Sequence, residues 1–311
     1  MPMITAQQPV VVHHMAALEN SPYPQNSLEG IRALLEGGAA FIEIDVTALA
    51  ADDYLLVHDP ILDNETSGEG EVSTTMPDEI AVLFIRTRDG EITSYRPPLL
   101  SEVVALFGDY GYRNHETRLQ IDYKNVFPMR DDEPMRRFLR LIEPLGDRVL
   151  VSSGADWNLR WMRRNAHWLD IGFDIGFYLD YRDKQGDSLL PPFSRGAYGY
   201  HDDHVLSKLA LLSPAQYLAE RCEVLLNTLP EASTWYVNYR LLMRALDEDF
   251  NMAEWLHEHG IKMDAWTLDV GKVPDETILR LRDAGVDQFT TNTPLALGQL
   301  LGIHTPALQE I

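Results

Sequence analysis

The amino-acid sequence predicts an α/β protein of the TIM-barrel class, with one closed (β/α)8 barrel. Short apolar runs alternate with amphipathic stretches from one end of the 311 residues to the other, which is the pattern of parallel strands joined by helices. Eight such units follow one another without a break in composition, and this favours a closed barrel over an open sheet. The length permits one sizeable core, so we expect a single domain over residues 1–311.

Each predicted element rests on its apolar pattern. The first strand is a β-branched run, and the first helix has apolar residues at helical spacing (Leu28, Ile31, Leu34) before two glycines end it. By the same criteria, the predicted strands cover residues 10–14, 40–46, 118–123, 148–152, 170–178, 234–238, 262–268 and 287–291. The predicted helices cover residues 26–37, 98–107, 135–142, 157–168, 213–221, 252–259, 274–284 and 295–301.

Two segments exceed the minimal barrel pattern. Residues 59–96 form a small insertion after the second strand, and residues 181–204 form a long loop rich in Gly, Pro, Asp and Tyr. Long loops that follow barrel strands belong to the catalytic face of this fold. We therefore expect the second segment on the rim of that face.

The composition limits the partners that this protein can have. A formal net charge of −22 argues against nucleic acid and against stable association with an anionic membrane, since both attract positive proteins. An anionic substrate would need local positive charge, such as a metal ion. The single cysteine, Cys222, excludes an intrachain disulfide, and no apolar run is long enough for a membrane span. Residues 1–8 show no signal-peptide pattern, so a cytoplasmic location is expected, with the oligomeric state left open.

Two short fragments carry the strongest chemical signal. Glu43 and Asp45 lie two residues apart on an apolar strand, so both point to the same face of the sheet. Carboxylates on a packed face are costly unless a cation lies beside them. His58 ends another apolar run and precedes an Asp-Pro turn. Each fragment alone fits a buried salt bridge or a loop histidine, but together they indicate a metal–carboxylate site with an acid/base histidine.

The predicted strand ends bring further polar residues to the same mouth, because the carboxyl ends of all barrel strands meet there. These residues are His13, His14, Asp122, Lys124, Ser152, Ser153, Trp266, Thr267, Thr291 and Asn292. Carboxylate oxygens suit Mg²⁺ or Ca²⁺ better than Zn²⁺. A divalent ion with a lysine and histidines fits phosphoryl chemistry, and Trp266 would form a wall for the substrate.

The chain resembles the glycerophosphodiester phosphodiesterases, which are metal-dependent (β/α)8 barrels, over nearly its whole length. In the first half, His13-His14-Met15 aligns with the family's His-Arg-Gly, Pro24-Gln25-Asn26-Ser27 with Pro-Glu-Asn-Thr, Glu43-Ile44-Asp45 with Glu-Leu-Asp, and His58-Asp59-Pro60 with His-Asp-Pro. Beyond these, Pro98-Leu99-Leu100-Ser101-Glu102-Val103-Val104 looks like Pro-Thr-Leu-x-Glu-Val-Leu and Asp122-Tyr123-Lys124 like Glu-x-Lys. Ala265-Trp266-Thr267 is similar to Val-Trp-Thr, and Thr291-Asn292-Thr293-Pro294 to Thr-Asp-x-Pro.

The resemblance implies a role for each matched position. Glu43, Asp45 and Asp122 would bind a divalent Mg²⁺ or Ca²⁺ ion, Lys124 would contact phosphate, and His58 would transfer a proton. The second catalytic histidine is His13 if His-His-Met replaces His-Arg-Gly, which we prefer. It is His14 if the likeness is closer to the related sphingomyelinase D enzymes, in which the histidine precedes Met.

The departures from the family bear on the substrate. The arginine after the histidine is absent, Gln25 replaces a glutamate, and Asp122 replaces a longer glutamate. We expect hydrolysis of a small-molecule glycerophosphodiester, or of a larger sugar or polyol phosphodiester bound by the loop 181–204, to a phosphomonoester and an alcohol. A sphingomyelinase D-like lyase that releases a cyclic phosphate, or a catalytically silent sensor of a phosphorylated ligand, are the alternatives.

Overall fold

The computed structural model describes residues 8–110, 116–126, 131–179 and 212–306. The predicted rim loop, residues 181–204, therefore lies outside the described residues. The long excursion at residues 59–96 lies inside them.

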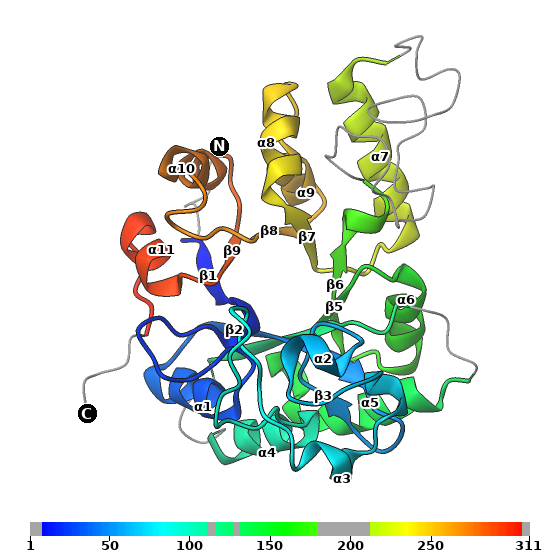
Figure 1. Ribbon diagram of the computed structural model, residues 1–311. Coiled ribbons are helices and arrows are strands. Elements are labelled where there is room, and N and C mark those ends of the chain that lie inside the picture. Colours follow the sequence, from blue (N-terminus) through cyan, green and yellow to red (C-terminus); the bar gives the residue numbers. More distant parts are fainter. Residues whose placement is uncertain (1–7, 111–115, 127–130, 180–211, 307–311) are drawn as a thin grey trace.

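Eight parallel strands close into a barrel, so the predicted fold class is confirmed (Figure 1). The strands are β1 (Val10–His13), β2 (Phe41–Ala48), β4 (Arg118–Tyr123), β5 (Val149–Ser153), β6 (Asp170–Asp174), β7 (Thr234–Asn238), β8 (Lys262–Trp266) and β9 (Gln288–Thr291). Their order runs β1-β9-β8-β7-β6-β5-β4-β2, and β1 also pairs with β2. Val12 lies opposite Thr290 on one side and Phe41 on the other, which closes the ring.

Helices surround the barrel and bury their apolar faces against it (Figure 1). They are α1 (Leu28–Gly37), α4 (Leu100–Tyr110), α5 (Glu133–Ile142), α6 (Asp156–Asn165), α7 (Pro214–Thr228), α8 (Tyr239–Asp247), α9 (Met252–Glu258), α10 (Asp275–Asp283) and α11 (Pro294–Leu301). The first of them shows why the sequence marks its ends. The Ser27 hydroxyl accepts from the Gly30 amide at the start, and Gly38 adopts a φ of 75° at the end, a conformation that glycine adopts without steric cost.

The structure differs from the sequence prediction at several places. Helix α8, which follows β7, was not predicted, and neither was the two-residue strand β3 (Tyr54–Leu55), which pairs antiparallel with the end of β2. The strand predicted over residues 170–178 ends at Asp174. There the carboxylate accepts a 2.8 Å hydrogen bond from the Gly176 amide and starts a short 3-10 helix.

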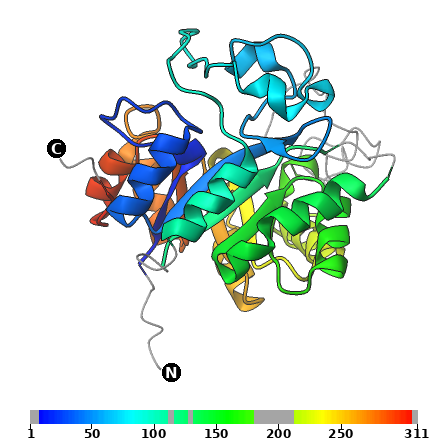
Figure 2. The same ribbon diagram turned by 90° about the horizontal axis from the view of Figure 1, so that it is seen from below.

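The insertion at residues 59–96 lies across one end of the barrel (Figure 2). It contains the short helices α2 (Leu62–Glu65) and α3 (Pro77–Ile80) and a 3-10 helix over Val72–Thr74. A small apolar cluster beneath it is separate from the main core and consists of Leu49, Leu55, Val57, Leu62, Val72 and Ile80. A bridge between Leu55 and Leu99 joins the chain on either side of the insertion.

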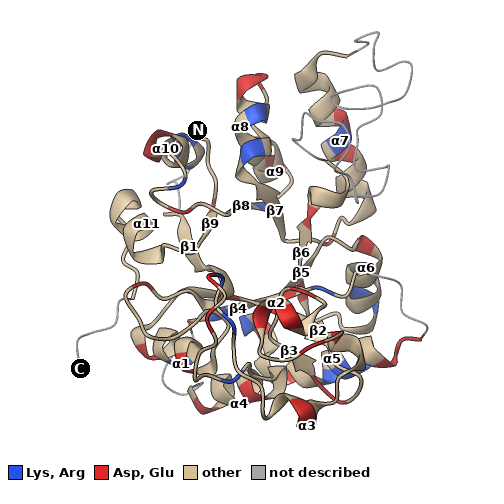
Figure 3. Ribbon diagram, viewed as in Figure 1, with Lys and Arg blue, Asp and Glu red and all other residues tan. Residues whose placement is uncertain are grey.

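The charge of the chain is distributed over its periphery. Asp and Glu residues occur on most outer helices, among them α2, α3 and α10 (Figure 3). Among the described residues, none of the helices combines the length and the apolar character that crossing a membrane requires.

Candidate active site

A cavity of about 730 Å³ opens between the insertion and the carboxyl ends of the barrel strands. Its polar lining includes His14, Glu43, His58, Asp59, Glu65, Arg86, Arg88, Gln120, Asp122, Lys124, Ser152, Asp174, Tyr236 and Trp266. Of the residues predicted to be catalytic, metal-binding or substrate-binding, all except His13 and Asp45 line it, and of the further residues predicted at the mouth, Ser153, Thr291 and Asn292 do not. Asp45 lies directly behind this lining, within the carboxylate cluster described next.

Three carboxylates converge at the base of the cavity. Glu43 and Asp45 come from β2 and are 3% and 1% exposed, and the register of β2 with β4 places Asp122 beside Asp45. One carboxylate oxygen of each residue lies within 4.8 Å of the others. Glu43 is oriented by the Met15 amide, which donates a 2.7 Å hydrogen bond to its Oε2. The i, i+2 spacing on a strand thus places both β2 carboxylates on the inner face of the barrel.

The pKa values of Glu43 and Asp45 are shifted in opposite directions. Burial raises the pKa of Glu43 well above its usual value, and the charges of Asp45 and Asp122 raise it further. Burial also acts to raise the pKa of Asp45, but Lys124, His58 and His14 together lower it below its usual value. Of these two carboxylates, Asp45 is therefore the one whose ionised form is favoured by the positive charges around it.

Lys124 lies between two of the carboxylates. Its Nζ is 2.5 Å from Asp122 Oδ2 and 2.9 Å from Asp45 Oδ1. Burial opposes the ammonium charge, yet Asp122, Asp45 and Glu43 raise the pKa of Lys124 well above its usual value. The lysine is thus a permanent cation whose charge is shared by two aspartates.

The carboxylate cluster fits a divalent cation. Three carboxylates against one ammonium leave two negative charges when all are ionised, and a divalent ion would balance them. The buried Oδ2 of Asp45 accepts no hydrogen bond from any described residue, so it has a free lone pair to offer. Carboxylate oxygens are the ligands that Mg²⁺ and Ca²⁺ prefer.

The two adjacent histidines have different surroundings. His13 is the last residue of β1 and is 1% exposed; its Nδ1 lies 2.8 Å from the Ala17 carbonyl, and burial lowers its pKa to about 4. His14 begins the following turn and lines the cavity. Of the two histidines, only His14 thus lines the cavity, which is consistent with the second of the two alignments considered above.

The orientation of His14 follows from two side chains at the other end of the chain. The Asn292 amide nitrogen donates to both oxygens of Asp269 at 3.0 Å, which turns its Oδ1 towards His14 Nδ1 at 2.8 Å. That oxygen can only accept, so Nδ1 carries the proton and Nε2 has the lone pair. Burial is the main cause that lowers the pKa of His14, and the imidazole is therefore neutral near pH 7.

Two of the departures from the family pattern lie together in this network. Gln25 and Asn292 both stand where the family has a carboxylate, and the Gln25 amide nitrogen donates a 2.6 Å hydrogen bond to Asn292 Oδ1. It also donates to the His14 carbonyl at 3.2 Å. The two amides thus act as a pair, in which one donates and the other accepts.

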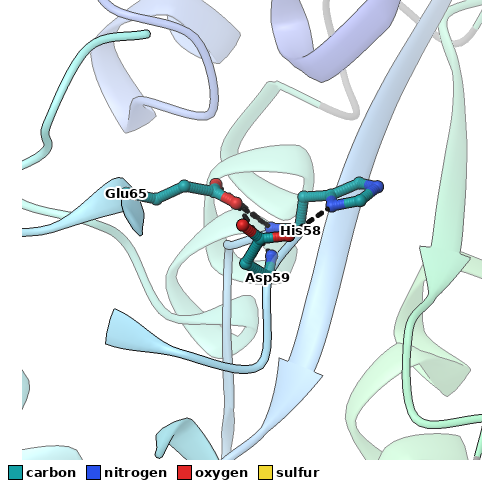
Figure 4. A group of neighbouring side chains, drawn as sticks. All are labelled: His58, Asp59 and Glu65. Carbon is teal, nitrogen blue, oxygen red and sulfur yellow. Dashed lines mark hydrogen bonds and ion pairs between the residues drawn. The ribbon is translucent and has the colours of Figure 1, made fainter. Parts of the chain in front are cut away.

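His58 reaches the cavity from the insertion side and has a side chain that is 53% exposed. Its Nδ1 lies 3.0 Å from Asp59 Oδ1, and the Glu65 carboxylate accepts from the backbone amides of both His58 and Asp59 at 2.8–3.1 Å. Figure 4 shows the imidazole extending away from Glu65. Burial raises the pKa of Glu65, whereas the two amides that it accepts from lower it.

The opposite wall of the cavity consists of residues from later strands. Trp266 lies there, and its buried Nε1 has no hydrogen-bond partner among the described residues. The same holds for the hydroxyl of Tyr236. Burial raises the pKa of Asp174 to about 7. The two unpaired polar atoms of this wall are thus buried behind its surface.

The residues that the structure brings to the site and that sequence reasoning missed include Glu65, Arg88, Asp174 and Asp269. Asp174 and Asp269 each lie within a few residues of a strand end, and that position was the available signal. Glu65 and Arg88 lie in the insertion, and the sequence of the insertion has no periodic apolar pattern from which its structure could be predicted. No feature of the sequence connects them with the barrel mouth.

Comparisons with known proteins agree with this geometry. The model of the Glycerophosphoryl diester phosphodiesterase family matches residues 19–296. A glycerophosphodiester phosphodiesterase of Caldanaerobacter subterraneus is 28% identical over 293 residues, which cover 94% of this chain and 97% of the relative.

Solved structures show the same fold. A glycerophosphodiester phosphodiesterase from Parabacteroides distasonis has a TM-score of 0.64 at 17% identity, covering 95% of this chain and 97% of its own. An Oleispira antarctica phosphodiesterase, in complex with the product sn-glycerol-3-phosphate, has a TM-score of 0.62 at 15% identity with the same coverage.

Proposed function

Because this chain belongs to the glycerophosphoryl diester phosphodiesterase family, and is therefore a phosphoric diester hydrolase, we propose that it is a metal-dependent enzyme that hydrolyses a glycerophosphodiester or a related polyol phosphodiester. The products are a phosphomonoester and an alcohol. The Oleispira antarctica relative was solved with the product sn-glycerol-3-phosphate, which supports this substrate class.

One observation carries the proposal. Three carboxylates from two neighbouring strands meet in a cavity whose rim also holds two histidines from different segments. Glu43, Asp45 and Asp122 would hold the metal ion. When bound, the ion supplies positive charge that neutralises the phosphoryl group and polarises its oxygens.

His14 is the general base in this proposal. Its buried imidazole is neutral near pH 7, and Asn292 fixes the tautomer so that Nε2 can accept a proton. The proton comes from the attacking water or from a neighbouring hydroxyl of the substrate. Asp269 and Asn292 hold the ring and do not touch the reacting atoms.

His58 is the general acid. Asp59 Oδ1 accepts a hydrogen bond from His58 Nδ1. His58 Nε2 has no partner among the described residues and can give a proton to the leaving oxygen of the substrate. Lys124 lowers the pKa of Asp45 and contributes positive charge beside the phosphate position. Trp266 and Tyr236 form the wall against which the alcohol part packs.

A panel of phosphodiesters assayed with Mg²⁺, Ca²⁺ and Mn²⁺ tests the proposal. We expect metal-dependent release of a phosphomonoester from at least one glycerophosphodiester or sugar phosphodiester, and loss of that release in excess chelator. Hydrolysis that continues in excess chelator would refute metal dependence. The absence of turnover on every diester, together with retained ligand binding, would instead support the silent sensor.

One observation favours a second candidate, the phosphodiester lyase. His14, the histidine at the cavity, is followed by Met15, as in the sphingomyelinase D alignment. In that reaction a hydroxyl of the substrate attacks its own phosphorus and a cyclic phosphate is the final product. Phosphorus NMR of the products distinguishes the two, because the cyclic diester and the monoester have different chemical shifts.

A further inference from the structure

Arg88 lies at the tip of a hairpin in the insertion and lines the active-site cavity. The hairpin spans residues 85–93 and is anchored by the buried side chain of Ile85. Its turn is closed by a 2.9 Å hydrogen bond from the Gly90 amide to the Thr87 carbonyl, and Gly90 has a φ of 88°. The turn thus holds the backbone of Arg88 at a defined position over the cavity.

The guanidinium of Arg88 reaches across to the barrel. Its Nη2 lies 3.3 Å from the sulfur of Met15, whose own amide donates to Glu43. When His14 is aligned with the family histidine, Met15 stands at the position where the family has its arginine. Burial is the main cause that lowers the pKa of His14, and the positive charge of Arg88 adds to this effect. The guanidinium is therefore a neighbour of the cavity histidine, next to the residue whose backbone amide orients Glu43.

The other cations of the cavity are already engaged. Lys124 is paired with Asp45 and Asp122, and Arg86 donates to the carbonyls of Thr66 and Gly90 at 3.1 and 3.3 Å. Arg88, in contrast, donates to no carbonyl or carboxylate oxygen in the described part of the chain, and its hydrogen bond there goes to the weak acceptor sulfur of Met15. In a protein with a net charge of −22, an arginine without an acidic partner at the mouth of an acidic cavity is available to an anion.

We propose that Arg88 is the phosphate-binding arginine of this site and contacts a non-bridging phosphoryl oxygen from the insertion side. The proposal rests on the function proposed above and deepens it, because it names the residue that replaces the missing donor. A guanidinium presents two parallel N–H groups to a phosphoryl group, which a histidine cannot do. The substrate would thus be held between the barrel, which supplies the carboxylates and Lys124, and the insertion, which supplies Arg88.

Isothermal titration calorimetry of inorganic phosphate, with Mg²⁺ present, tests this on the full chain. Arg88→Met should bind phosphate about 10- to 100-fold more weakly than the wild type, because this is what one hydrogen bond to a charged group contributes to the affinity. Arg88→Lys should lie between them, because it keeps the charge but loses the paired donors. Arg96→Met is the matched control, since Arg96 is exposed on the same insertion but does not line the cavity.

Two further measurements separate the proposal from a structural role. The Mg²⁺ affinity without phosphate should be the same in Arg88→Met and wild type, and the KM for a diester should rise more than kcat falls. Equal phosphate affinity of Arg88→Met and wild type would overturn the proposal, and so would parallel losses of Mg²⁺ affinity and thermal stability. A wild type that binds no phosphate would also overturn it. A wild type that binds phosphate but hydrolyses no diester would refute the proposed function alone. The comparison of phosphate affinity between Arg88→Met and the wild type would then still test the role of Arg88.

Discussion

The barrel strands and the insertion hold their parts of the active site in different ways. Glu43 and Asp45 lie on a central strand with parallel neighbours on both sides and are almost completely buried. His58 and Arg88 lie on a segment with only short helices, isolated bridges and a small core of its own. His58 is half exposed, and one carboxylate, that of Glu65, fixes its backbone.

This difference matches the demands of the chemistry. Metal ligands must keep fixed separations, and a closed parallel barrel provides them because each strand is hydrogen-bonded on both sides. Groups that admit the substrate and release the product need room to move, and elements with few buried contacts open most easily. The predictions below test whether the two regions are separate in function.

The largest effect should come from the barrel. Glu43→Gln or Asp45→Asn should lower turnover about 10³-fold or more, because the charge stabilisation by a metal is worth several kcal/mol. Glu43→Gln keeps the oxygen that accepts from Met15 and removes a charge that Asp45 and Asp122 repel, so the fold should persist. Steady-state kinetics and a Mg²⁺ titration check this. Full activity of both variants with unchanged Mg²⁺ affinity would show that the cluster holds no metal.

Substitution of the histidines should have the next largest effect. His14→Ala and His58→Ala should each lower kcat by roughly 10²- to 10⁴-fold, the usual share of general acid/base catalysis. His13→Gln is the control, and it should keep most of its kcat because His13 does not line the cavity. The pH–rate profile should lose its acidic limb in His14→Ala, which lacks the base, and its basic limb in His58→Ala, which lacks the acid. A large loss of kcat in His13→Gln with normal rates in His14→Ala would instead support the alignment in which His13 is the family histidine.

The buried His13 should make stability depend on pH. Its pKa is about 4 in the folded protein and near 6.5 in the unfolded chain, so between these values the unfolded state binds a proton that the folded state does not. The free energy of unfolding should therefore fall as pH falls from 6.5 to 4, by about 3 kcal/mol from this residue. Urea unfolding at several pH values measures the slope, which should be shallower in His13→Gln. An unchanged slope would mean that His13 is not buried as a neutral group.

The smallest effect should come from the support of the insertion. Glu65→Ala removes the acceptor that holds the His58 and Asp59 amides, so kcat/KM should fall by about tenfold, as for other residues that orient a catalytic group. Mg²⁺ affinity of the barrel cluster should not change, because Glu65 is not one of its three carboxylates and lies in a separate group with His58 and Asp59. Asp63→Ala, which removes another carboxylate of α2, should have little effect on activity. A parallel fall in Mg²⁺ affinity in Glu65→Ala would show that the two regions are not separate.

The sequence predicted the barrel because its strands and helices are locally periodic. The same reasoning reached Glu43, Asp45 and His58, since two-residue spacing on a strand and an Asp-Pro turn are local features. The choice between His13 and His14 depends on where β1 ends, and one residue decides which side chain faces the cavity. A pattern read from sequence does not resolve a boundary to one residue.

Contacts between distant segments were beyond the reach of the sequence. The link from Asp269 through Asn292 to His14 joins positions more than 250 residues apart. The contact of Arg88 with Met15 joins an irregular insertion to the first strand end. Neither contact has a periodicity or a motif, because each arises only when the barrel closes and the insertion folds over it.

The pairing of Leu55 with Leu99 has a consequence for how this protein can change over generations. The Leu56 amide also donates to the Pro98 carbonyl at 3.1 Å, so the polypeptide leaves the barrel and returns to it at adjacent positions. A segment with its ends clamped together can be exchanged for a longer or shorter one at small cost, since doubling a loop adds only about 0.6 kcal/mol of closure entropy. The part of this stretch that follows His58 can thus change in length and sequence while His58 stays at its start. The carboxylate-bearing strands then remain in register, and new substrate preferences can arise without a new scaffold.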